Sequence, residues 1–82
     1  MFTNKAKDLT NNLCGKNVAA FRKAMGISQR ALADTLQLLG LDVDKNAIQR
    51  IESGKRFVTD IELVFLSRAL HCSLQDLVNA VK

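Results

Sequence analysis

Apolar residues recur at helical spacing along most of the chain, in segments separated by short polar or glycine-containing joints. Four segments follow a residue that commonly caps a helix: Ser28, Asp44, Thr59 and Ser73. Each cap is preceded by an apolar residue that can contact another apolar residue four positions after the cap, the arrangement called a hydrophobic staple. The pattern therefore predicts helices that begin near residues 29, 45, 60 and 74.

A further helix precedes these four. One of its faces carries three apolar residues: Val18, Phe21 and Met25. Gly26 is suited to end it, and either Asn11 or Asn12 could cap its start. Because no alternating strand pattern is found, the sequence predicts an all-α protein, a compact bundle of about five short helices. We expect residues 1–12 to form a loosely ordered N-terminal arm and residues 13–82 to form one domain.

The second and third predicted helices are joined by a short segment. The second helix, about residues 29–39, carries an apolar stripe and ends at Gly40: Leu32, Leu36 and Leu39. The third, about residues 45–53, follows after only a few residues. Two short helices joined through a glycine-containing turn form a helix-turn-helix, which can place its second helix in a DNA groove.

The third helix places an acidic residue on its apolar side. Ile48 and Ile51 share a face with Glu52. Arg22 lies on the apolar face of the first helix, and an unpaired buried charge is costly, so we expect Arg22 and Glu52 to form a structural ion pair. In the alternative, Arg22 extends to water and Glu52 only caps a loop amide.

The opposite face of the third helix is rich in hydrogen-bond donors. Arginine can bond two atoms of guanine, and asparagine or glutamine two atoms of adenine, so this face suits contact with DNA bases. The candidates are Lys45, Asn46, Gln49 and Arg50. Candidates for phosphate contact lie at the start of the second helix and after the third: Gln29, Arg30, Lys55 and Arg56. The alternative is a solvated polar surface. Asp42 and Asp44 count against DNA contact, because carboxylates that faced the duplex would repel its phosphates. Asp44 would not do so if it serves only as a helix cap.

Three stretches together resemble a known family: "GISQRALAD", "AIQRIESGKR" and "LSRALHCSLQDLV". They are similar to the lambda-repressor-like, Cro-type helix-turn-helix family, also called the XRE family, over about residues 16–79. The resemblance implies a sequence-specific regulator of transcription that binds double-stranded DNA, acting as a repressor. It also implies phosphate contact by Gln29, an Arg22–Glu52 pair, and a left-handed backbone at His71, where relatives often have glycine. The chain departs from the family pattern between the second and third helices, where it is longer by about five residues.

The predicted helix at residues 60–69 is apolar on two sides. Leu63, Leu66 and Leu70 form one stripe, and a second stripe contains Ile61, Phe65 and Ala69. A helix with two apolar sides needs a second cover, which either the last helix or another copy of the chain could supply. A homodimer would use the residues Phe57, Ile61, Phe65 and Leu74.

Composition narrows the classes of function. Net charge is +4, with the positive excess in residues 16–56, which favours an acidic partner. One histidine and two distant cysteines give no metal cluster, so we expect no metal, no cofactor and no enzyme activity. The sequence leaves a disulfide between Cys14 and Cys72 open, but two cysteines in a chain without a membrane-spanning stretch or secretory signal favour a reducing compartment. We expect a cytoplasmic, bacterial or phage-type protein of the nucleoid. The alternative function is an antitoxin-like or protein-interaction module with the same fold, which binds a partner protein.

Overall fold

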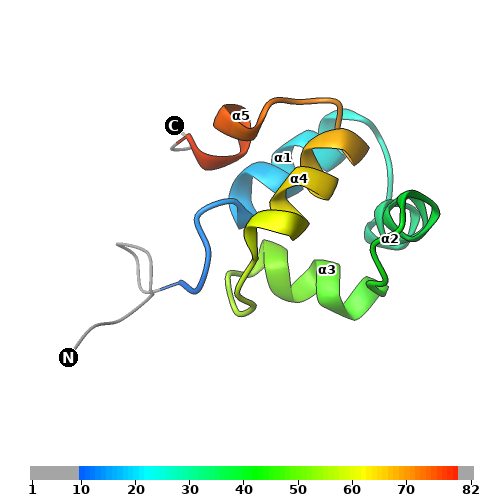
Figure 1. The fold of residues 1–82 in the computed structure, drawn as a ribbon, viewed down its shortest axis with the longest axis horizontal. Helices are drawn as coiled ribbons and strands as arrows, with labels where there is room; N and C mark the ends of the chain where they lie inside the picture. Colours follow the sequence, from blue (N-terminus) through cyan, green and yellow to red (C-terminus); the bar gives the residue numbers. More distant parts are fainter. Residues whose placement is uncertain (1–9, 80–82) are drawn as a thin grey trace.

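The protein is an all-α bundle, as the sequence predicts. The structure is a computed structural model that describes residues 10–79, and within them it contains five helices and no strand (Figure 1). They are α1 (Gly15–Ala24), α2 (Gln29–Leu39), α3 (Lys45–Glu52), α4 (Asp60–Ala69) and α5 (Leu74–Val78). Residues 1–9 of the predicted N-terminal arm lie outside the described residues. No helix in the described range is long and apolar enough to span a membrane.

Local capping explains where the last four helices begin. The side-chain oxygens of Ser28, Asp44, Thr59 and Ser73 each accept a hydrogen bond from the backbone amide three residues later, as predicted. Two of these caps, at Thr59 and Ser73, form complete capping boxes. The start of α1 is different, because Cys14 offers no side-chain cap. Instead Asn12 Oδ1 accepts from the Gly15 amide at 2.8 Å, which settles the start that the sequence left open.

The end of α4 uses a residue type that is rare in such a position. His71 has a φ of 54°, in the left-handed region, which confirms the conformation implied by the resemblance. The amide of Cys72 reaches back to the Ser67 carbonyl at 3.1 Å, so the last turn of α4 closes as it would around a glycine. A left-handed histidine costs about 1–2 kcal/mol relative to a relaxed backbone.

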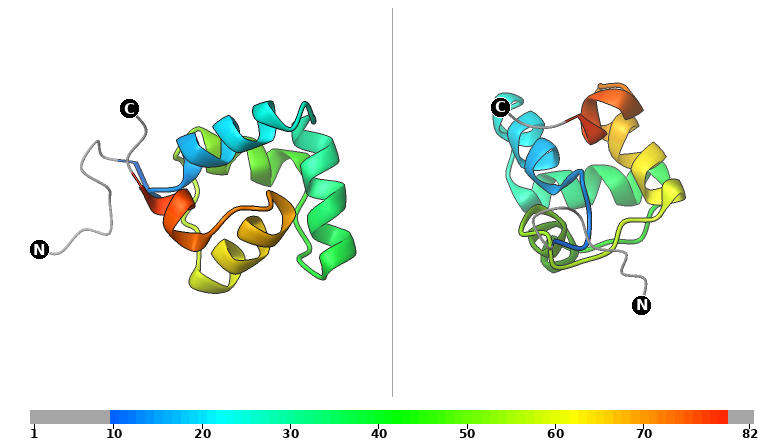
Figure 2. Two further views of the ribbon diagram at one scale, coloured as in Figure 1. Left: turned by 90° about the horizontal axis from the view of Figure 1, so that it is seen from above. Right: turned by 90° about the vertical axis from the view of Figure 1, so that its left-hand side faces the viewer.

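The core lies where all five helices meet. α3 packs against both α1 and α2, which fixes its position in the bundle. α4 packs against α2 and α5. Figures 1 and 2 show α2 at one end of the molecule, with its axis across those of α3 and α4, and α5 near the opposite end. The buried apolar residues are Cys14, Val18, Leu32, Ala33, Leu36, Val43, Ile48, Ile51, Leu66, Ala69, Leu70 and Leu77.

Three predicted faces are wrong in detail. Met25 and Leu39, expected in the core, are 40% and 43% exposed, because each lies at the end of its helix, where less of the bundle covers it. Ala69, expected on the second stripe of α4, is buried. Residues spaced i, i+4 and i+8 drift by about 80° around a helix, so Ala69 turns into the core while Ile61 stays outside.

Candidate nucleic-acid interface

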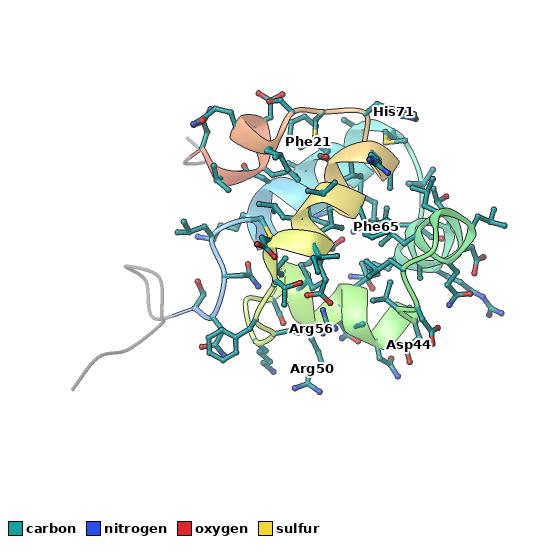
Figure 3. All side chains as sticks on the ribbon, viewed as in Figure 1. Phe21, Asp44, Arg50, Arg56, Phe65 and His71 are labelled. Atoms are coloured by element: carbon teal, nitrogen blue, oxygen red, sulfur yellow. The ribbon has the colours of Figure 1, made fainter. Side chains whose placement is uncertain are left out.

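α3 has one face fixed in the core and one face open to solvent. Ile48 and Ile51 are almost completely buried, and they fix the rotation of the helix about its axis. The opposite side presents the four residues that the sequence predicts to contact bases, all of them exposed: Lys45, Asn46, Gln49 and Arg50. Figure 3 shows Arg50 pointing away from the body of the molecule. The structure thus brings these four side chains together on one surface.

The Arg22–Glu52 pair is present and largely buried. Arg22 Nε and Nη2 donate to the two Glu52 oxygens at 2.6 and 2.9 Å, a bidentate arrangement. The third nitrogen, Nη1, donates to the Ile27 carbonyl at 2.9 Å. Only 12% of the Arg22 side chain and 8% of the Glu52 side chain are exposed. The hydrogen bonds to Glu52 raise the pKa of Arg22 above its usual value, and the pair links α1 to α3.

Glu52 also holds a residue of α2. Gln29 Nε2 donates to Glu52 Oε1 at 3.1 Å, so one carboxylate joins the first three helices. Gln29 is the first residue of α2 and is half-buried, whereas the neighbouring Arg30 is exposed. The bond to Glu52 therefore fixes the side chain of a residue that the sequence predicts to contact phosphate.

The two basic residues after α3 differ in their surroundings. Lys55 is exposed, but Arg56 Nη2 bonds Glu62 Oε2 at 2.9 Å, and Arg56 lies closer to the body of the molecule than Arg50 (Figure 3). Partial burial alone would raise the pKa of Glu62. The hydrogen bond from the Thr59 amide and the charge and hydrogen bond of Arg56 outweigh burial and lower the pKa of Glu62. Phosphate contact by Arg56 would have to compete with this ion pair.

The two aspartates near α3 have different roles. Asp44 Oδ1 accepts from the Ala47 amide at 2.8 Å and caps the helix, which agrees with the interpretation of Asp44 as a cap. Figure 3 shows it at the start of α3, at the far end from Arg56. Asp42 is exposed. Asp44, which directly precedes the predicted base-contacting residues, therefore serves the fold as the cap of α3.

Two residues near the start of α1 fix the end of α3, and sequence reasoning missed these contacts, although it named Asn12 as a possible cap of α1. Asn12 Nδ2 donates to the carbonyls of Ile51 and Arg56, at 3.1 and 2.7 Å. Gly15 lies so close to α3 that a Cβ at this position would collide with the Ile51 carbonyl oxygen. Both contacts join segments nearly 40 residues apart, so no local pattern marks them.

The predicted dimer surface is only partly exposed. Phe57, Ile61 and Leu74 are 54%, 66% and 45% exposed. Phe65 instead packs against the core, and its ring lies close to Gly40 at the end of α2. The exposed side of α4 carries Val64 next to Ile61.

The comparisons with known proteins agree with this architecture. A search of curated protein sequences found no match. The P22 c2 repressor, solved in complex with a synthetic operator, is 31% identical with a TM-score of 0.70, over 83% of this chain and 96% of that one. The restriction-modification controller protein C.AhdI from Aeromonas hydrophila is 27% identical with a TM-score of 0.68, over 77% and 84%. The clp gene regulator ClgR from C. glutamicum shares the fold at 24% identity, with a TM-score of 0.70 over 82% and 80%. A family model described as helix-turn-helix matches residues 18–77, which is most of the chain, so this protein belongs to the XRE-type helix-turn-helix family.

Proposed function

We propose that this protein binds double-stranded DNA sequence-specifically and represses transcription, with α3 lying in the major groove. The observation that carries the proposal is the exposed face of α3, where four side chains able to bond base edges project from a helix whose other face is fixed in the core. A fixed helix can present its side chains in one register, and base recognition requires such a register.

The proposed roles follow from the chemistry and the position of each residue. Lys45, Asn46, Gln49 and Arg50 would contact base edges. Gln29, Arg30, Lys55 and Arg56 would contact phosphates on either side of the groove. Gln29 uses one amide proton in its bond to Glu52, and the second remains for a phosphate oxygen. The net charge of +4 supports attraction to a polyanion.

Regulation would follow from occupancy. The P22 c2 repressor resembles this chain over 96% of the repressor chain, and its structure was solved in complex with a synthetic operator. This likeness supports the proposal that the present protein also binds an operator. A protein bound across a promoter excludes RNA polymerase from it. Such a regulator works where the bacterial chromosome lies, in the cytoplasm.

Selection of bound duplexes from a random DNA pool tests the proposal. A sequence-specific binder should enrich one motif, and a dimer should enrich a motif with two-fold symmetry. A folded protein that enriches no motif would contradict DNA recognition and favour the antitoxin-like or protein-interaction module. Binding to a partner protein would then be the function to measure.

Two single variants should separate base contact from phosphate contact. Arg50→Ala should relax preference at one base position by about 1–3 kcal/mol if the guanidinium bonds guanine. Lys55→Ala should weaken binding to specific and random duplexes by the same factor. Fluorescence anisotropy on the selected duplex and on single-base variants of it measures both effects. Equal losses on all sequences for Arg50→Ala would show that Arg50 does not read a base.

We also propose a homodimer built on the exposed side of α4, together with Phe57 and Leu74. Ile61→Glu should give monomers that keep their helical circular dichroism, because Ile61 is exposed in one subunit and a charge is costly to bury in an apolar contact. DNA affinity should fall, since the second half-site is no longer tethered at high effective concentration. Phe65→Glu should instead unfold the protein, because Phe65 packs on the core.

A matched variant controls for the change of charge. Leu38→Glu alters a leucine of α2 that is 89% exposed and does not belong to the proposed interface, and it should leave the mass unchanged. Light scattering measures all three variants and the wild type. A monomeric wild type, or an Ile61→Glu variant with the mass of a dimer, would contradict this interface.

A further inference from the structure

The segment before α1 is bonded to the loop that follows α3. The Asn11 amide donates to the Gly54 carbonyl at 2.7 Å, and its side chain donates to the Lys55 carbonyl at 3.0 Å. The side chain of Thr10 lies so close to Gly54 that a Cβ on that glycine would collide with it. Residues 10–12 thus lie along the loop at residues 53–56.

Asn12 is the centre of this joint. Its Oδ1 accepts from the Gly15 amide at 2.8 Å, and its Nδ2 donates to the Ile51 carbonyl at 3.1 Å and the Arg56 carbonyl at 2.7 Å. One side chain therefore satisfies the first turn of α1, the last turn of α3 and the loop. Only an amide has both the acceptor and the two donor protons that these three partners require.

The loop that Asn12 holds carries two residues proposed to contact phosphates: Arg56, whose side chain bonds Glu62, and Lys55. Gly54 adopts a φ of 80°, and the Lys55 amide returns to the Arg50 carbonyl at 2.9 Å, so the chain turns sharply after α3. Lys55 leaves this turn exposed to solvent. The direction of its side chain depends on the backbone of the loop, whose outer carbonyls at residues 54–56 are bonded by Asn11 and Asn12.

We infer that Asn12 is a positioning residue for DNA binding: it fixes the loop so that Lys55 reaches a phosphate while α3 lies in the groove. This inference rests on the proposed function. Asn12 itself touches no DNA. Its effect on binding passes through Lys55, and that dependence distinguishes positioning from a general contribution to the fold.

The variant Asn12→Leu tests the inference, because leucine has nearly the shape of asparagine and none of its hydrogen bonds. Its affinity for specific and random duplexes should fall alike, by roughly five- to tenfold, as for the loss of one phosphate contact. The log–log salt slope should flatten by about one per subunit. In a Lys55→Ala background, Asn12→Leu should cost no further affinity.

Asn17→Leu is the matched control. Asn17 donates to the carbonyls of Leu77 and Asn79, a similar bridge from α1 to the end of α5, outside the proposed DNA surface. At a temperature where circular dichroism shows both variants folded, Asn17→Leu should bind DNA as the wild type does. If Asn12→Leu does not fold, Asn12→Ser keeps an acceptor for Gly15 and undergoes the same measurements.

The outcomes separate the two proposals. A wild type that binds no duplex would overturn both. A wild type that binds, with a folded Asn12 variant of equal affinity, would overturn only the positioning role. The same would follow if the Asn12 variant lost equal affinity with and without Lys55, because its effect would then not pass through that residue.

Discussion

Replacing Glu52 by glutamine or Arg22 by methionine should lower the free energy of unfolding by about 3–5 kcal/mol, because each leaves a largely buried partner unpaired. That is a large share of the roughly 5–15 kcal/mol that stabilises a typical domain. Arg22→Met also leaves Glu52 with Gln29 as its remaining side-chain donor, and Glu52→Gln replaces one of the two acceptor oxygens by an NH2 group that cannot accept from Arg22. Chemical denaturation followed by circular dichroism measures the loss.

The double variant identifies the pair as the cause. Removing both charges leaves no unpaired ion, so the double change should cost less than the sum of the single changes. The Arg56–Glu62 pair supplies a comparison, since its arginine is 31% exposed. Arg56→Met should therefore cost about 1 kcal/mol or less. Additive losses for Arg22 and Glu52 would show that the observed contact contributes nothing to stability.

The helices could be predicted from the sequence because their signals are local. A cap such as Ser28 and the apolar residues of the following turn lie within a few positions of one another. They therefore indicate where a helix starts, whichever other helices it later packs against. The same holds for the outward face of α3, whose residues are assigned by the helical period alone. The Arg22–Glu52 contact was predictable because each charge lies on an apolar face and needs an opposite partner.

The features that the sequence did not predict depend on which element packs against a given side of a helix or loop. Periodicity states that Phe65 and Ala69 are on a side of α4, but not which neighbour lies there, and the structure places α2 beside Phe65. The ion pair of Arg56 with Glu62 depends on how the loop returns to α4. Asn12 and Gly15 contact α3 from far away in sequence, and the only role that the sequence suggests for Asn12 is to cap α1. Long-range contacts of this kind have no signature in one sequence.

The affinity for DNA should fall steeply as salt rises. The proposed surface offers five cations for phosphates or bases: Arg30, Lys45, Arg50, Lys55 and Arg56. Each neutralised phosphate releases counterions and contributes about −0.9 to the log–log slope. Arg30, Lys55 and Arg56 contact phosphates directly in this proposal, and the charges of Lys45 and Arg50 in the groove also displace counterions. Four to five such cations then give a slope of about −4 per subunit, and about −8 for a dimer on two half-sites.

The size of the slope decides between the assemblies as well as testing DNA binding. Between 50 and 200 mM salt, a slope near −4 corresponds to a few hundredfold loss of affinity, and a slope near −8 to roughly 10⁵-fold. Lys55→Ala should reduce the slope by about one per subunit. Arg68→Gln, which alters an exposed cation on α4 outside the proposed DNA surface, should leave the slope unchanged once light scattering shows that the variant has the mass of the wild type. A slope close to zero, or equal effects of the two variants, would mean that the basic residues around α3 do not lie against a phosphate backbone. The protein-interaction module would then be the better account of the exposed face of α3.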